Sequence, residues 1–229
     1  AGCATPTVTP TAAPSALPTL GPTTPAYTLG PSMSPDGATG ACPTSAPPAF
    51  SGKATVTMTT NFGDIVISVD GSLGANAAGA FIALSRCGYY NNIIFHRLVP
   101  GFIIQAGDGT NARLPKASMD CLMGSGGPSW TVQDDKVVSK YKRGTISMAR
   151  TSAANSGNSQ FFIVLDDSAG STLGDPATAN NYAIFGDVTK GMDVVDAIAA
   201  VPTGGDTCPG AGSATQPLEP IVITSTIVS

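Results

Sequence analysis

Residues 95–108 read FHRLVPGFIIQAGD, and this stretch decides the fold. It holds the only histidine of the chain, an arginine, two phenylalanines and a glutamine, in a run that otherwise has the apolar character of buried strand. A Pro-Gly step divides the run into two short strands. Arg97, Phe102 and Gln105 are spaced so that a charged fork, an apolar wall and an amide can line one cavity.

Two later blocks carry matching residues. Residues 144–165 read GTISMARTSAANSGNSQFFIVL and contain an Ala-Arg step that looks exposed, followed by Gln160 and Phe162. Residues 180–198 read NNYAIFGDVTKGMDVVDAI and supply apolar positions that close the core. In this order and spacing the three blocks resemble the cyclophilin family of peptidyl-prolyl cis–trans isomerases. The resemblance covers about residues 54–229.

The resemblance implies a mostly-β fold, a closed barrel of eight antiparallel strands with a helix covering each mouth. The residue pattern points the same way, because many short strands with two helices are typical of a closed barrel. Alternation over residues 54–69 predicts a strand, a turn and a strand, and residues 220–228 alternate like a final edge strand. Helices are predicted at residues 75–87, before a glycine C-cap, and at residues 192–200.

The resemblance also implies an enzyme that uses no nucleophile, metal or cofactor. Rotation about an Xaa-Pro bond breaks amide resonance, a barrier of about 18–20 kcal/mol. A donor aimed at the amide nitrogen lowers it, because the nitrogen lone pair is localised only in the twisted state. Arg97 matches the family's catalytic arginine, and Gln105 matches an amide that holds the substrate backbone and positions the arginine. The alternative for Arg97 is a structural salt bridge, but no acidic residue lies near it in the sequence and its flanks are apolar, which favours the catalytic role.

The remaining site residues come from the same resemblance. They form an apolar cup for the proline ring, an edge that pairs with the substrate backbone, a second amide and a glycine loop beside the residue before proline. These residues are Phe102, Ile103, Gly124, Ala149, Arg150, Gln160, Phe162, Leu173 and Tyr182. By periodicity alone the phenylalanines and Ile103 are core residues. His96 is read as a core residue too, since the chain has no Gly-x-Ser-x-Gly element to accompany it.

The sequence departs from the family pattern at several points. Most relatives have asparagine where Arg150 stands. Because that contact uses main-chain atoms, we expect binding to be kept and the preference for flanking residues to change. Trp130 lies outside the segment where many relatives carry tryptophan, so strong binding of cyclosporin-type ligands is not expected. Residues 111–123 form an insertion beside the site that restricts access or offers a partner surface.

Composition limits the partners. A net charge of −4 and a pI near 4.7 argue against nucleic acid. The one basic cluster, residues 140–143, is interrupted by Tyr141 and is interpreted as a solvated turn. No apolar run reaches the roughly 18–20 residues that a membrane span requires. The partners that the cyclophilin resemblance implies are proline-containing polypeptides.

The cysteines and the N-terminal residues favour an exported protein, extracellular or in the cell envelope. Ala1-Gly2-Cys3 reads like the end of a lipoprotein processing site, which would place a lipid on Cys3 and anchor the chain to a membrane. The alternative is cleavage before the alanine, with Cys3 left as a thiol or disulfide partner. The other cysteines form no Cys-x-x-Cys pair, which argues against zinc and favours two disulfides. They are Cys42, Cys87, Cys121 and Cys208; the alternative is that some are small buried apolar residues.

Residues 1–50 have a different composition from the predicted domain at residues 51–229. Eleven of the 19 prolines lie in residues 1–50, with abundant Thr and Ala and the single charge of Asp36. Such a segment buries too little surface to offset chain entropy, so an extended spacer is expected. Alternatively, its strand-prone stretches add to the sheet edge of a neighbouring subunit and build an extracellular polymer.

These features leave three hypotheses. The first is an isomerase that acts on Xaa-Pro bonds of exported or envelope proteins. The second is a structural protein in which a cyclophilin-like barrel assembles through residues 1–50. The third is a peptide-binding module that recognises proline without turnover.

Overall fold

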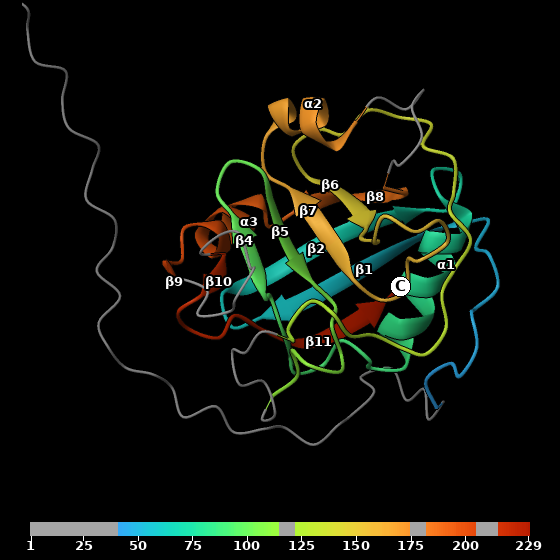
Figure 1. Cartoon of the computed structure of the whole chain (residues 1–229), viewed down its shortest axis with the longest axis horizontal. Helices are drawn as coiled ribbons and strands as arrows, with labels where there is room; N and C mark the ends of the chain where they lie inside the picture. Colours follow the sequence, from blue (N-terminus) through green and yellow to red (C-terminus); the bar gives the residue numbers. More distant parts are fainter. Residues whose placement is uncertain (1–40, 115–121, 175–181, 205–214) are drawn as a thin grey trace, which may run out of the picture. The chain divides into compact units, whose positions relative to one another are not determined.

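The computed structural model describes residues 41–114, 122–174, 182–204 and 215–229. Most strands in this part of the chain belong to one antiparallel sheet (Figure 1). In spatial order its strands are β3 (Ile93–Ile94), β11 (Val222–Val228), β1 (Lys53–Thr60), β2 (Gly63–Asp70), β8 (Ile184–Lys190), β6 (Thr145–Met148), β7 (Phe161–Val164), β5 (Ile103–Ala106) and β4 (Arg97–Val99). A separate pair joins β9 (Thr203–Gly204) to β10 (Gln216–Pro217).

The mostly-β prediction is confirmed, the predicted number of eight strands is corrected, and closure of the barrel stays a prediction. The described ladder has nine strands, and β3 and β4 are its two ends. These ends are consecutive in the chain. Phe95 N–H donates to the Ile221 carbonyl at 2.9 Å, whereas His96 N–H donates to the Gln105 carbonyl at 3.1 Å. The chain therefore changes partner from β11 to β5 between two adjacent residues, and this break divides one expected strand into two.

The period-two prediction for the first hairpin is confirmed. β1 and β2 pair in register from Lys53 opposite Asp70 to Thr60 opposite Gly63. Alternate residues of both strands are buried, including Val56, Met58 and Ile65. These side chains enter the main core because successive residues of a strand point to opposite faces.

Two predicted helices are present, and two short ones were not predicted. α1 (Ala75–Arg86) covers the core with Phe81, whose ring packs against Tyr90, Phe161 and Phe185. α3 (Met192–Ala199) follows β8. The additional turns are the 3₁₀ helix η1 (Asp167–Ala169) and α2 (Gly170–Leu173). No helix in the described part of the chain is long and apolar enough to cross a membrane.

The start of α1 is capped from a distant loop. Gly74 at the N-cap has no side chain that can accept a hydrogen bond. Instead Asp135 accepts the N–H of Asn76 at 3.1 Å and of Ala77 at 2.9 Å. A carboxylate at this end also complements the helix dipole. The loop that follows Trp130 is thereby fixed to α1.

Residues 41–50 lie against the domain although they belong to the predicted tail. Cys42 forms a disulfide with Cys87, directly after α1. The Pro43 carbonyl accepts a hydrogen bond from Trp130 Nε1 at 2.9 Å, and Phe50 N–H donates to the Ala75 carbonyl at 2.8 Å. Two disulfides were expected among four cysteines with their pairing left open, and the structure shows one of them, between Cys42 and Cys87. Cys121 and Cys208, like Cys3, lie outside the described residues.

Candidate active site

The register of three neighbouring strands brings the predicted polar and apolar site residues together. Arg97 on β4 lies opposite Gln105 on β5, and Gln105 lies opposite Phe162 on β7. Directly opposed residues in a sheet point to the same face, with Cβ atoms about 4.5–5.5 Å apart. A cation, an amide and an aromatic ring therefore stand in one row across the sheet.

Both faces of β5 and β7 are packed, and each strand divides its residues between two clusters. Ile104 and Phe161 point into the main core, whereas Ile103 and Phe162 belong to a second apolar cluster on the other face. The second cluster, here called the pocket cluster, consists of Ile103, Val137, Tyr141, Phe162, Val164, Ala169, Leu173 and Ile184, with Leu73, Val99, Phe102, Ala149 and Tyr182 packed against it. It includes every apolar residue that the resemblance assigned to the site, as well as Tyr182.

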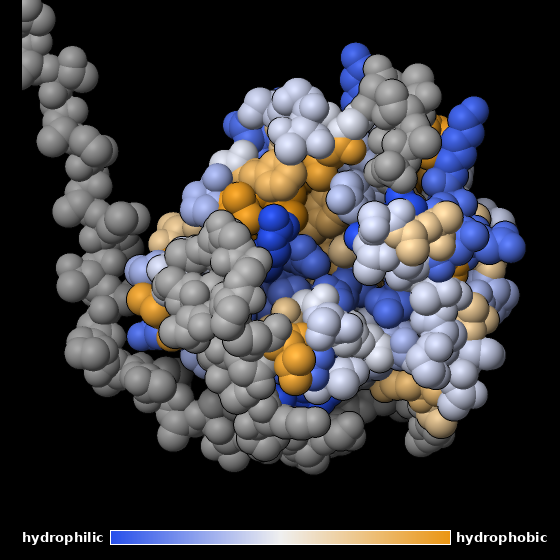
Figure 2. Space-filling view, in the orientation of Figure 1, coloured by the Kyte–Doolittle hydropathy of each residue, from blue (hydrophilic) through white to orange (hydrophobic). Residues whose placement is uncertain are grey.

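The molecular surface has a hollow over these strands. In Figure 2 apolar atoms border one side of the hollow and hydrophilic atoms border the other, over the region that Figure 1 labels β4, β5 and β7. The partly exposed members of the pocket cluster include Phe102, Ala149 and Tyr182. An apolar surface beside a few polar groups is the usual composition of a ligand site.

The polar side of the site is a line of hydrogen bonds between side chains. Arg97 NH1 donates to Gln105 Oε1 at 3.3 Å, and Gln105 Nε2 donates to Gln160 Oε1 at 3.0 Å. Gln160 Nε2 then donates to the Gly124 carbonyl at 2.9 Å and to the Gly126 carbonyl at 2.8 Å. The two predicted glutamines and the predicted glycine therefore lie in one network with Arg97.

Arg97 is half-buried and keeps its charge. Burial lowers the pKa of its guanidinium, and the nearby Tyr182 acts in the opposite direction. An arginine remains protonated in proteins despite such shifts. The salt-bridge alternative is not observed, because the ion pairs between described residues involve other cations. The guanidinium thus presents donors at the edge of the pocket cluster without a neutralising carboxylate among those residues.

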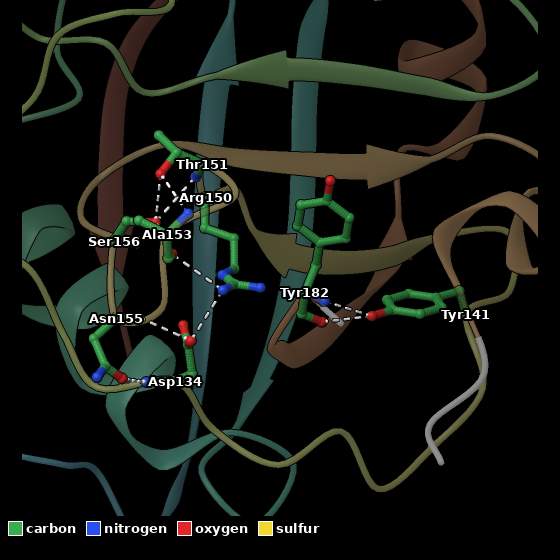
Figure 3. A network of polar contacts seen from close by, with 8 residues as sticks. All are labelled: Asp134, Tyr141, Arg150, Thr151, Ala153, Asn155, Ser156 and Tyr182. Carbon is green, nitrogen blue, oxygen red and sulfur yellow. Dashed lines mark hydrogen bonds and ion pairs between the residues drawn. The ribbon is translucent and has the colours of Figure 1, made fainter. Parts of the chain in front are cut away.

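Arg150 is buried and paired, which corrects the prediction of an exposed Ala-Arg step. Its side chain is only 7% exposed. NH2 lies 3.2 Å from Asp134 Oδ2 and donates to the Ala153 carbonyl at 3.1 Å, and a second guanidinium nitrogen points toward Tyr182 (Figure 3). The edge residue Ala149 donates its N–H to the Gln160 carbonyl at 2.9 Å. Arg150 therefore ties the predicted substrate edge to the loop that contains Asp134.

Tyr141 is a pocket residue that sequence reasoning missed. Its hydroxyl donates to the Tyr182 carbonyl and accepts the Tyr182 N–H, both at 2.8 Å (Figure 3). The Tyr182 ring in turn packs edge-on against Phe162, with ring centroids 5.3 Å apart. The solvated-turn interpretation is therefore wrong for Tyr141, which is 3% exposed. The sequence signal that could have identified Tyr141 as buried is its position as a single aromatic residue among Lys140, Lys142 and Arg143.

His96 is buried behind the site. Neither ring nitrogen has a hydrogen-bond partner among the described residues. Burial lowers the pKa of His96 from 6.5 to about 4; Asp108 acts against this shift and Arg97 adds to it. A Cβ atom on Gly124 would stand 3.1 Å from His96 Nε2, and Gly124 has φ of +88°, so this position favours glycine in both respects. The His96 ring therefore packs against the backbone of the glycine loop at Gly124.

No group of three or more His, Cys, Asp or Glu side chains within the described ranges is arranged to hold a metal ion. The described site presents hydrogen-bond donors and apolar surfaces. These are a fixed cation, two oriented amides and a packed aromatic wall.

Comparison with known proteins identifies relatives of this arrangement. The family model described as cyclophilin type peptidyl-prolyl cis-trans isomerase/CLD matches residues 55–228. The chain is 37% identical over 150 residues to peptidyl-prolyl cis-trans isomerase B of Escherichia coli (strain K12), which covers 65% of this chain and 86% of that protein. It is 34% identical over 174 residues to the isomerase cyp18 of Streptomyces antibioticus, covering 75% and 96%.

Solved structures agree with this result. A crystal structure of a Cryptosporidium parvum cyclophilin type peptidyl-prolyl cis-trans isomerase matches with a TM-score of 0.61 and 28% identity, covering 77% of this chain and 98% of the other. A second structure of that protein, determined in the presence of the dipeptide Ala-Pro, matches with a TM-score of 0.60 and 29% identity, covering 76% and 98%.

The burial of His96 predicts a pH dependence of stability. The neutral ring is favoured in the folded state, since its folded pKa of about 4 lies below the ordinary 6.5. This contribution is full above pH 6.5 and is lost as the pH falls toward 4. It amounts to about 3 kcal/mol in the free energy of unfolding. Urea unfolding at pH 7 and pH 4 measures it, with His96→Asn as the control. If the free energy of unfolding falls by the same amount between pH 7 and pH 4 in wild type and His96→Asn, the prediction is contradicted.

The double hydrogen bond of Tyr141 predicts a binding defect. Tyr141→Phe leaves the Tyr182 N–H without its partner, which costs about 1–2 kcal/mol and loosens the wall of the pocket cluster. We expect the affinity for a proline-containing peptide to fall severalfold, as measured by calorimetry. Tyr90→Phe is the matched control, since it removes a buried hydrogen bond of 3.0 Å to the Ser159 carbonyl within the main core. Equal affinity of Tyr141→Phe and wild type would refute the assignment.

Proposed function

Because the chain belongs to the cyclophilin-type family and is a peptidyl-prolyl cis–trans isomerase, we propose that it isomerises Xaa-Pro bonds of exported or cell-envelope proteins with Arg97 as its catalytic residue. The observation that carries this proposal is the row formed by Arg97, Gln105 and Phe162 across β4, β5 and β7. It combines a cation, an orienting amide and an apolar wall within one site.

The catalytic step requires a site that prefers the twisted amide to both planar forms. The proline ring occupies the pocket cluster against Phe102, Ile103 and Phe162, which excludes water from one side of the bond. Arg97 directs an N–H toward the imide nitrogen, whose lone pair is available only while the bond is rotated. Gln105 Oε1 holds the guanidinium through its 3.3 Å hydrogen bond. No bond to the protein forms or breaks.

The peptide backbone is held along the edge at Ala149, and the amide of Gln160 orients Gln105 through a hydrogen bond of 3.0 Å. A related structure determined with the dipeptide Ala-Pro supports a proline-containing peptide as the ligand. Arg150 lies within this edge and is neutralised by Asp134 at 3.2 Å. We therefore assign it a structural part in holding the edge, together with an influence on the residues that flank proline.

Export is proposed on the Cys42–Cys87 disulfide, because such bonds persist in oxidising compartments. A lipid on Cys3 would anchor the chain to a membrane, with residues 1–40 acting as a spacer. Self-assembly through residues 1–50 stays a prediction. Of that segment the structure describes residues 41–50, and these contact the chain's own domain.

The role of Arg97 predicts a loss of rate without a loss of fold. Arg97→Ala should reduce isomerisation about 100-fold or more, since one preorganised donor in a transition state is worth that much. Arg97→Lys should also lose most of the rate, because the planar fork is absent. Proline-limited refolding and magnetisation exchange on an Ala-Pro peptide measure both variants. Arg143→Ala is the matched control, since that arginine forms an ion pair with Asp196 on α3 and is not part of the hydrogen-bond network of Arg97. Wild-type rates in Arg97→Ala would reject the proposal.

The export proposal predicts the chemical state of the cysteines in the producing cells. We expect the protein in the envelope or the medium, with Cys42 and Cys87 joined in one peptide under non-reducing mass spectrometry. The mass of the N-terminal peptide distinguishes a lipid on Cys3 from a free thiol. Protein confined to the cytoplasmic fraction, with Cys42 and Cys87 both reactive toward iodoacetamide, would count against export.

A further inference from the structure

A buried carboxylate organises the glycine loop beside the site. Asp108 is fully buried and follows β5 by two residues. Its Oδ1 accepts the N–H of Thr110 at 3.0 Å and of Asn111 at 2.8 Å. Its Oδ2 accepts the N–H of Gly124 at 2.8 Å and of Gly126 at 3.0 Å. One side chain therefore fixes both ends of the segment 108–126.

The charge of Asp108 is balanced by these backbone donors. It takes part in none of the ion pairs between described residues. A carboxylate accepts on both oxygens and donates on neither, which suits four converging N–H groups. Gly126 is held so closely that a Cβ atom there would stand 2.3 Å from Asp108 Oδ1. The loop therefore sits directly on the carboxylate.

The loop carbonyls determine the direction of both site amides. The Gly124 and Gly126 carbonyls can only accept, so Gln160 must present its Nε2 to them. Its Oε1 then faces Gln105, which must donate with Nε2. Gln105 is left with Oε1 toward Arg97, the acceptor that a guanidinium requires. A reversed Gln105 would place its NH₂ group against the guanidinium, and a reversed Gln160 would place its Oε1 against two carbonyl oxygens.

We infer that Asp108 is a positioning residue for catalysis, acting on Arg97 through the glycine loop and the two glutamines. This inference rests on the proposed catalytic role of Arg97. Asp108 touches no substrate in this arrangement. It fixes the N–H groups of Gly124 and Gly126 and thereby the position of the loop backbone. The carbonyl oxygens of the same two glycines then orient Gln160, which orients Gln105 and through it Arg97.

The inference is tested on the full chain with Asp108→Asn. The carboxamide turns one acceptor into a donor that faces backbone N–H groups, so the loop must shift. We expect kcat for an Ala-Pro peptide to fall about 10- to 100-fold with KM near the wild-type value, since misplacement by about 1 Å has effects of that size. Magnetisation exchange at several peptide concentrations separates kcat from KM. Side-chain amide resonances of Gln105 and Gln160 should shift in the same variant.

A double-mutant cycle separates positioning from general destabilisation. In an Arg97→Ala background, Asp108→Asn should lower the residual kcat by no more than about twofold, because the group it positions is gone. An equal factor in both backgrounds would overturn the inference, as would wild-type kcat in Asp108→Asn. Wild-type kcat in Arg97→Ala would instead reject the proposed catalytic role itself, whatever Asp108→Asn does.

Two further variants complete the test. Asp70→Asn is the matched control. The Asp70 carboxylate accepts the N–H of Ser72, two residues later, at 2.9 Å, just as Asp108 accepts the N–H of Thr110. Asp70 lies far from the site residues in the sequence. It should keep wild-type kcat. If Asp108→Asn fails to fold, Asn111→Ala decides, since Asn111 Nδ2 holds the loop through the Leu122 carbonyl at 3.0 Å. A severalfold loss of kcat that disappears in Arg97→Ala supports the inference, and an unchanged kcat overturns it.

Discussion

The register between β4, β5 and β7 is the constraint on which the site depends. It sets Arg97 opposite Gln105 and Gln105 opposite Phe162. A shift by one residue would turn these side chains into the main core and bring Ile104 and Phe161 outward, because strand residues alternate between faces. The apolar side chains of both faces are packed, so this register is held by two cores at once.

Groups of the candidate site are held in place by neighbours to which no chemical role is assigned. Tyr141 fixes the backbone of Tyr182 from both sides, and Asp134 neutralises Arg150 beneath the substrate edge. Such supporting contacts matter in an isomerase, where catalysis consists of preferring one geometry of the substrate.

Much of the fold and of the site was predictable from the sequence. The first hairpin, α1, α3 and the final strand follow from periodicity and glycine caps, and the predicted site residues lie together. The predicted number of eight strands was not correct, since the backbones of Phe95 and His96 bond to different segments of the chain and divide one expected strand into two. The exposed reading of Arg150 and the solvated reading of Tyr141 were also wrong. In each case the deciding partner lies in another segment of the chain. Phe95 and His96 bond to the backbone of Ile221 and Gln105, Arg150 pairs with Asp134, and Tyr141 bonds to Tyr182.

Through its resemblance to the cyclophilin family, the sequence by itself identified Arg97, the two glutamines and the aromatic residues as a set that would bind and rotate an imide. By periodicity alone the aromatic residues are core residues. Only the tertiary structure decided which way the amides point and what holds the loop. Those contacts run from Asp108 to backbone N–H groups 16 and 18 residues away. Backbone donors are the same in every residue except proline, so no residue pattern identifies which of them a buried carboxylate will meet.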